Sequence, residues 1–162
     1  MTTVAWPPGR EPDRSPVHTR NEAFVPLPPQ AVWDRLVDAA AWPSWYPNAR
    51  RVVLTDATLL GPGVEFRWTT LHLRVRCVVD RWEPHRALGW TGRAAGSSGH
   101  HRWILTPRPG GTHVLTEETQ TGLLPHLGGR WLTRSLLRWH QRWLEGIDGP
   151  SSGVPGPGDR LR

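Results

Sequence analysis

The feature that most constrains the fold is a series of short alternating segments between residues 51 and 121, followed by one long stretch with helical spacing. Apolar side chains occupy every second position in residues 64–69, 73–80, 88–91, 103–105 and 114–116. Turns rich in Gly, Pro and Ser separate these segments, as in Pro109-Gly110-Gly111. This alternation is typical of antiparallel strands that bury one face. We therefore expect about six consecutive antiparallel strands after residue 50.

The long stretch from about Pro125 to Ile147 is the expected C-terminal helix. It carries one apolar stripe formed by Leu132, Leu136, Trp139, Trp143 and Ile147. An antiparallel sheet must cover its apolar face, and no other expected element is long enough to do so. A curved sheet wrapped round this helix would leave a wedge-shaped space in which a ligand could sit.

The segment before the sheet predicts one strand and two short helices. Residues 17–25 read as an extended strand, and Pro28 or Pro29 suits the first turn of the helix that follows. Asp38 can cap a second helix, which Pro43 and Pro47 keep short. The complete order predicts an α+β fold of about seven strands around one long helix.

The chain length of 162 residues is that of one domain. Residues 1–16 and 149–162 are dense in Pro, Gly and Ser and lack apolar periodicity. They are predicted to be disordered tails, which leaves residues 17–148 as a single domain.

Several classes of protein and site are excluded by what the sequence lacks. The single cysteine, Cys77, rules out a disulfide framework and a multi-cysteine zinc site. No metal is expected, because His100 and His101 are adjacent on a strand and point to opposite faces. No glycine-rich phosphate loop precedes a helix, so no cofactor is expected. Without a signal peptide or an apolar run of about 18 residues, the prediction is a cytoplasmic protein that is not integral to a membrane.

The net charge of +6 comes entirely from arginine, since the chain has 20 arginines and no lysine. Such a charge suits a nucleic acid or an anionic membrane, or it reflects arginine used wherever lysine would serve. The absence of lysine favours the second interpretation, so no nucleic-acid partner is expected. Arginines recur every fourth residue on the last helix, at positions 130, 134, 138 and 142. This stripe is a ridge for phosphates, a solvated face, or a source of one side chain, such as Arg138, that reaches a ligand over the cavity rim.

Five segments together resemble the START-like, or SRPBCC, superfamily and its polyketide cyclase/dehydrase group. They are residues 32–38, 42–47, 63–68, 101–107 and 111–118, and the resemblance covers roughly residues 17–147. It implies a helix-grip (Bet v 1/START-like) fold, which agrees with the order of elements derived above. The superfamily includes cyclases, dehydratases, lipid carriers, hormone receptors and chaperone regulators, so the fold does not fix the function.

The hairpin around Pro109-Gly110 brings His101 opposite Glu118. If the apolar positions of both strands face inward, paired residue numbers sum to 219, so Trp103 opposes Thr116. Directly opposed residues have Cβ atoms about 4.5–5.5 Å apart. An imidazole beside a carboxylate in an apolar cavity can act as a general base for enolisation, cyclisation or dehydration of a poly-β-ketone. The alternative is a buried polar pair whose members only satisfy each other.

The remaining candidates are residues expected to face the cavity. Trp68, Trp90 and Trp103 form either an aromatic wall for a planar ligand or ordinary core. The Tyr46 hydroxyl either binds a ligand or packs, and the inward Cys77 thiol should be inert. The predicted ligand contacts are Tyr46, Phe66, Trp68, Cys77, Trp90, Trp103, Thr116, Trp131 and Arg138.

Three functions fit these residues. The first is a cofactor-independent polyketide cyclase or dehydratase with His101 as base and Glu118 orienting it. The second is a non-catalytic carrier of a lipid or aromatic metabolite in the same cavity. The third is a protein-interaction module that uses the basic C-terminal helix. For the first two the partner is a hydrophobic small molecule, and the chain is predicted to be a monomer or homodimer.

Overall fold

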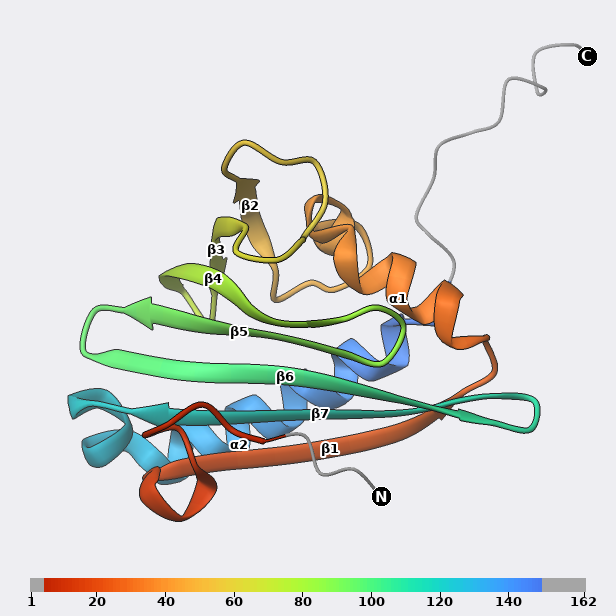
Figure 1. Ribbon diagram of the computed structural model, residues 1–162. Helices are drawn as coiled ribbons and strands as arrows, with labels where there is room; N and C mark the ends of the chain where they lie inside the picture. Colours follow the sequence, from red (N-terminus) through yellow and green to blue (C-terminus); the bar gives the residue numbers. More distant parts are fainter. Residues whose placement is uncertain (1–4, 150–162) are drawn as a thin grey trace, which may run out of the picture.

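The computed structural model describes residues 5–149 and has the predicted α+β architecture (Figure 1). The elements, in chain order, are η1 (Pro12–Arg14), β1 (Val17–Val25), α1 (Pro29–Val37), η2 (Ala39–Ser44), β2 (Arg50–Leu54), β3 (Glu65–Thr70), β4 (Leu73–Glu83), β5 (Ala87–Ala94), β6 (Ser97–Arg108), β7 (Gly111–Thr121) and α2 (Leu123–Gly146). The strands form one antiparallel seven-stranded sheet in the order β1-β7-β6-β5-β4-β3-β2. The prediction of about seven strands and one long C-terminal helix is therefore confirmed. The predicted C-terminal tail lies, except for Gly149, outside the described residues.

The register of the β6–β7 hairpin is the predicted one. His101 pairs with Glu118 and Trp103 with Thr116, and the ladder closes at Arg108 and Gly111. The two-residue turn is accommodated by Gly110, whose φ of 79° lies in the left-handed region. Inward apolar side chains on both strands fix this register, because a slip of one residue would turn them toward solvent.

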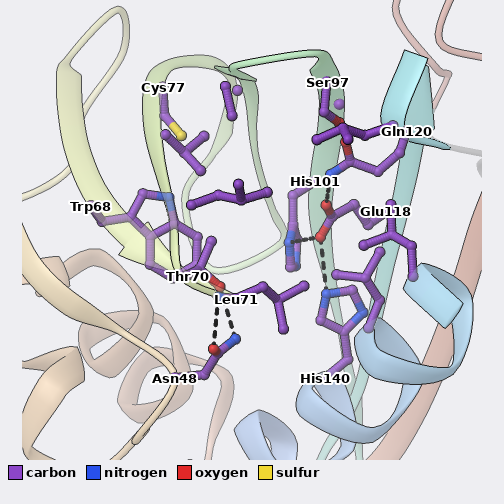
Figure 2. A pocket seen from close by; sticks show the side chains of 18 of the residues that line it. Asn48, Trp68, Thr70, Leu71, Cys77, Ser97, His101, Glu118, Gln120 and His140 are labelled. Atoms are coloured by element: carbon purple, nitrogen blue, oxygen red, sulfur yellow. Dashed lines mark hydrogen bonds and ion pairs between the residues drawn. The ribbon is translucent and has the colours of Figure 1, made fainter. Parts of the chain in front are cut away.

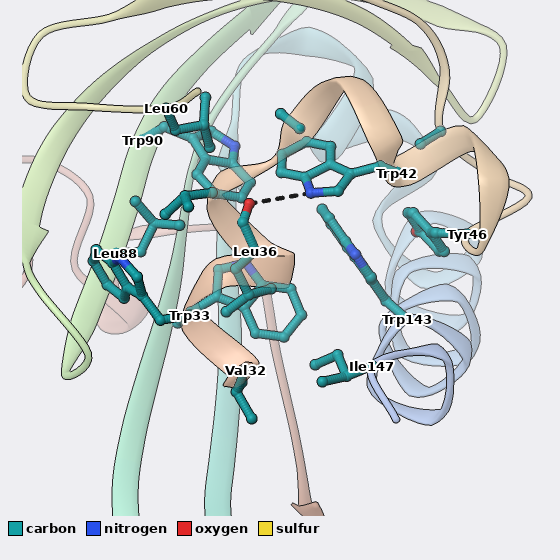
Figure 3. Packing of buried hydrophobic residues seen from close by; sticks show 14 of the residues in the cluster. Val32, Trp33, Leu36, Trp42, Tyr46, Leu60, Leu88, Trp90, Trp143 and Ile147 are labelled. Atoms are coloured by element: carbon teal, nitrogen blue, oxygen red, sulfur yellow. Dashed lines mark hydrogen bonds between the residues drawn. The ribbon is translucent and has the colours of Figure 1, made fainter. Parts of the chain in front are cut away.

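The aromatic core lies between α1, η2, the sheet and the C-terminal half of α2 (Figure 3). The indole N–H of Trp42 donates to the carbonyl of Leu36 at 3.1 Å, which ties η2 to α1. The Tyr46 ring stacks on Trp143 of α2, with centroids 4.3 Å apart and planes 7° from parallel. Packing here fills the space between the sheet and the C-terminal half of α2, while a cavity lies along the N-terminal half.

Part of the predicted N-terminal tail packs on the sheet instead of being disordered. Trp6 lies over the guanidinium of Arg102, 3.8 Å from the ring centroid, and Arg102 forms a buried ion pair with Glu117. The Arg10 guanidinium donates to the hydroxyls of Ser98 at 2.6 Å and Thr121 at 3.1 Å. The prediction for residues 1–16 is thus wrong for residues 5–16, because the Trp6 ring on Arg102 and the Arg10 hydrogen bonds hold the segment on the sheet despite its low apolar content. Residues 1–4 lie outside the described part of the chain.

Candidate functional site

A cavity of about 410 Å³ lies between α2 and the inner face of the sheet. Six of the residues predicted to contact a ligand or to react with it line its interior, namely Tyr46, Trp68, Cys77, Trp90, His101 and Glu118. A seventh, Trp131 on α2, lines it and is also 66% exposed, so the cavity opens to solvent beside this side chain. The inward positions of β3 to β7 therefore do converge on one internal space.

A cluster of three ionisable residues forms one polar wall of the cavity (Figure 2). His101 Nδ1 and His140 Nε2 each lie 3.0 Å from the same oxygen of Glu118, Oε2. The side-chain amide of Gln120 donates to the other oxygen, Oε1. Glu118 and Gln120 come from β7, His101 from β6 and His140 from α2, so the cluster joins the sheet to the helix.

The hydrogen bonds of the cluster define the tautomer of each histidine. Because an ionised carboxylate only accepts, His101 donates from Nδ1 and His140 donates from Nε2. The remaining nitrogen of each ring accepts from a threonine hydroxyl. His101 Nε2 lies 2.7 Å from Thr116 Oγ1, and His140 Nδ1 lies 3.3 Å from Thr19 Oγ1. Both rings are thus satisfied in their neutral form.

Burial and hydrogen bonding set the charge of the cluster. Burial, which disfavours an imidazolium ion, lowers the pKa of His101 to about 4 despite the adjacent carboxylate. Burial alone would raise the pKa of Glu118, but the hydrogen bonds from His101 and His140 outweigh it and hold this pKa well below its usual range. At neutral pH the site therefore contains a neutral His101 and an ionised Glu118.

Aromatic rings hold His101 in place. Its ring stacks against Trp90 at 4.9 Å and against Trp103 at 5.3 Å, with interplanar angles of 24° and 20°. Trp143 contacts the same ring edge-on at 5.3 Å. The three predicted aromatic residues therefore lie in different places. Trp68 and Trp90 line the cavity, whereas Trp103 is fully buried in the core and does not line it.

Three further predicted contacts lie outside the cavity lining. Phe66 is buried in the aromatic core, and Thr116 is buried with its hydroxyl on His101. Arg138 is exposed on α2 and does not reach the cavity. For Phe66 and Thr116 the inward face was predicted correctly, but neighbouring side chains separate them from the cavity. Arg138 lies on the solvent side of the helix, because the buried stripe of α2 passes through Leu132, Leu136 and Trp143.

Tyr46 and Cys77 line the cavity, and both side chains stay protonated and unreactive at neutral pH. The Tyr46 hydroxyl accepts from the amide of Asn48 at 3.0 Å, and burial raises the pKa of this phenol well above its usual value. Burial also raises the pKa of the Cys77 thiol to about 12, so the nucleophilic thiolate is scarcely populated at neutral pH. Both residues shape the cavity wall.

His140 is the functional residue that the sequence analysis missed. It follows Leu136 by four positions and precedes Trp143 by three, so helical spacing places it on the buried stripe of α2. A polar residue on that stripe is the signal that could have identified it. Asn48 was also missed, and it holds the rim by donating to Thr70 Oγ1 at 2.8 Å and accepting from the Leu71 amide at 3.0 Å.

The cluster also bears on the expectation that no metal is bound. His101, Glu118 and His140 offer three metal-ligating atoms within 4.8 Å of one another, the one such buried group within residues 5–149. Spacing in the sequence could not reveal it, because the three residues come from three elements. In the structure His101 Nδ1 and His140 Nε2 both share a hydrogen bond with Glu118 Oε2, so one nitrogen of each ring is engaged within the group.

Comparison with known families identifies the chain. Residues 16–147 match the family model described as polyketide cyclase / dehydrase and lipid transport. The chain belongs to this family. The resemblance seen in the sequence is thereby confirmed, and the match covers every element from β1 to α2. No curated protein has a sequence that matches the chain.

Solved structures share the fold of this family member. Hypothetical protein jhp0584 from Helicobacter pylori superposes with a TM-score of 0.84 at 26% identity, covering 93% of this chain and 97% of the other. The ZhuI aromatase/cyclase from Streptomyces sp. R1128 gives 0.67 at 16% identity, covering 82% and 91%. The di-domain ARO/CYC StfQ from the steffimycin biosynthetic pathway gives 0.69 at 19% identity, with 83% of this chain spanning 50% of that one. The helix-grip fold is therefore established. In the part of this family member that the structure describes, no helix is long and apolar enough to cross a membrane.

Proposed function

We propose that the chain binds an apolar or aromatic small molecule, polyketide- or lipid-like, in the cavity between α2 and the sheet. The observation that carries this proposal is the cavity itself. Its volume of about 410 Å³ falls in the range of small-molecule sites, which are mostly apolar with a few converging polar groups. The family match and the aromatase/cyclase neighbours support a ligand of the polyketide class.

The polar wall has hydrogen-bonding capacity left for an oxygen of the ligand. Glu118 accepts three hydrogen bonds, from His101, His140 and Gln120, out of about four that a carboxylate can accept. The Gln120 side-chain amide donates one of its two N–H groups to Glu118, and its oxygen accepts from the Ser97 hydroxyl. The second N–H group is left for a ligand. A ligand hydroxyl can therefore donate to Glu118, and a ligand carbonyl can accept from Gln120. The remaining surface would select for planar, apolar parts of the molecule.

A second function, cyclisation or dehydration of a poly-β-ketone, is favoured by the hydrogen bond between His101 and Glu118. In that reaction a carbon between two carbonyls loses a proton to His101 Nε2, and the resulting enolate carbon forms a bond to another ketone carbon. The new alkoxide takes the proton back from His101, and loss of water then gives an alkene. The step requires Thr116 to withdraw its hydroxyl from Nε2. An imidazole with a pKa of about 4 is a weak base near neutral pH, which makes binding the primary proposal.

The binding proposal is tested by a valine-to-tryptophan substitution that fills the cavity. The same substitution at an outward position of the same strand is the control. Val75 lines the cavity, whereas Val78 on the same strand faces outward and is 42% exposed. The fluorescent probe 1-anilinonaphthalene-8-sulfonate, an aromatic anion, should bind the wild type and Val78→Trp but not Val75→Trp, and a hydroxyanthraquinone should compete for the same site. Native mass spectrometry of the purified protein would reveal any molecule that it already carries. Equal probe binding by all three proteins would refute the cavity as the binding site.

Catalysis is separated from binding by His101→Asn. If the chain is a cyclase, this variant should lose turnover of a poly-β-ketone thioester while retaining affinity for a hydroxyanthraquinone within about threefold, because little apolar contact is removed. Thr116→Val removes the hydroxyl that occupies His101 Nε2, the proposed base atom. If the chain is a cyclase, this variant should keep the wild-type turnover or exceed it. Turnover that is absent in the wild type would leave the chain as a carrier.

A further inference from the structure

The first half of α2 exposes large apolar side chains beside the opening of the cavity. Leu127 is 79% exposed, and Leu123 and Trp131 are each 66% exposed. Leu123 and Leu127 lie four residues apart before the interruption at Gly128, so they share one side of the first helical segment. Trp131 follows the interruption and borders the same outer groove as Leu127. Leu127 and Trp131 also line the cavity, which places this apolar side at its mouth. Exposed leucine and tryptophan side chains in a contiguous group mark a surface that is covered in use.

Positive charge is interleaved with these apolar residues. Arg130 and Arg134 border a shallow groove on the outside of α2 together with Leu127 and Trp131. Neither arginine forms an ion pair or side-chain hydrogen bond with any residue between positions 5 and 149. Between Glu118 and Glu145 the sequence has four arginines and no acidic residue. We call Leu123, Leu127, Trp131, Arg130 and Arg134 the mouth face.

We propose that the mouth face docks onto an anionic lipid bilayer, so that an apolar ligand passes between the bilayer and the cavity without crossing water. A helix with leucine and tryptophan set among arginines is the composition of an interfacial helix, which lies in the plane of the membrane surface. Unpaired arginines suit the phosphate groups of anionic lipids, and each contributes through attraction to the negative surface potential. The apolar side chains would enter the boundary between headgroups and acyl chains.

The position of the opening supports a bilayer as the occupant. The first turn of α2 is bound to the β5–β6 turn, where the Leu124 amide donates to the Gly96 carbonyl at 3.0 Å (Figure 1). The helix is interrupted just after this turn, at Gly128, whose backbone angles are not helical. Leu124, Leu127 and Gly128 all line the cavity, so the docked surface and the opening coincide. The route taken by the ligand rests on the proposed function, whereas the docking itself does not.

Co-flotation of the full chain with vesicles tests the docking. Vesicles of phosphatidylcholine with about one-third phosphatidylglycerol should carry the wild type, and vesicles of phosphatidylcholine alone should carry far less. Arg130→Gln/Arg134→Gln should weaken partitioning by about 30-fold. The matched control is Arg67→Gln/Arg76→Gln. It removes the same charge from two exposed arginines that lie opposite each other on β3 and β4, on the outer face of the sheet. This control should retain most of the binding.

The apolar part of the mouth face is tested by Leu127→Ser/Trp131→Ser. This variant should reduce flotation by at least about tenfold, and circular dichroism would verify that it folds. The docking is overturned if the wild type does not float with anionic vesicles, or if the arginine and apolar variants float as well as the control. A second copy of the chain could cover the mouth face instead of a bilayer. In that case the wild type would be a dimer that does not float, Leu127→Ser/Trp131→Ser would make it monomeric, and the docking would be overturned. Loss of probe binding by the cavity with flotation intact would contradict only the proposed function.

Discussion

The neutral, buried state of His101 predicts that the protein loses stability over a defined range of pH. In the unfolded chain this imidazole takes up a proton near its ordinary pKa of 6.5, whereas in the folded protein it does so only at about pH 4. Between these values the unfolded state binds more protons, so the free energy of unfolding falls as the pH is lowered. The contribution of His101 to stability is complete well above pH 6.5, declines by up to about 1.4 kcal/mol per pH unit between about pH 6.5 and pH 4, and is lost below that range.

The expected size of this effect can be measured against a variant that does not titrate. From about pH 7.5 to about pH 5 the His101 contribution amounts to about 2 kcal/mol. Urea unfolding at several pH values should show that the wild type loses about 2 kcal/mol more than His101→Gln across this interval. Staying above about pH 5 keeps the measurement clear of Glu118, whose lowered pKa acts below the ordinary value of 4.5. Parallel pH curves for the two proteins would mean that His101 titrates alike in both states, and the reasoning would fail.

Three other predictions concern packing and reactivity. Trp143→Ala should cost about 3–5 kcal/mol in urea unfolding, because Trp143 is 1% exposed and stacks on Tyr46; a loss below about 1 kcal/mol would contradict the described core. Trp6→Ala should cost about 1–2 kcal/mol through its contact with Arg102, whereas Trp131→Ala should be nearly neutral, and equal melting temperatures for the two would refute the packing of residues 5–16. The Cys77 thiol, with its pKa of about 12, should react with a thiol-specific disulfide reagent only in denaturant, so rapid labelling of the native protein would show that the thiol is accessible.

The fold could be predicted because it depends on local patterns. Alternation along the strands selects which side chains face inward, and helical spacing identifies α2 as the covering element. The same alternation fixed the register of β6 and β7, and with it the contact between His101 and Glu118. A hairpin joins residues close in sequence, so its pairing follows from the turn and the apolar pattern alone.

Other features depended on how distant elements pack. His140 lies 22 residues after Glu118 in the chain. Its imidazole reaches the Glu118 carboxylate only because α2 packs along the inner face of the sheet. Whether an inward side chain touches the cavity or lies behind a neighbour, as Trp103 does behind His101, is decided by side-chain volumes and not by periodicity. The packing of Trp6 on Arg102 likewise joins positions 96 residues apart. The sequence by itself determined the architecture and the His101–Glu118 pair through short-range periodicity, while the third member of the site, the limits of the cavity and its opening beside Trp131 arose from long-range packing that only the tertiary structure decided.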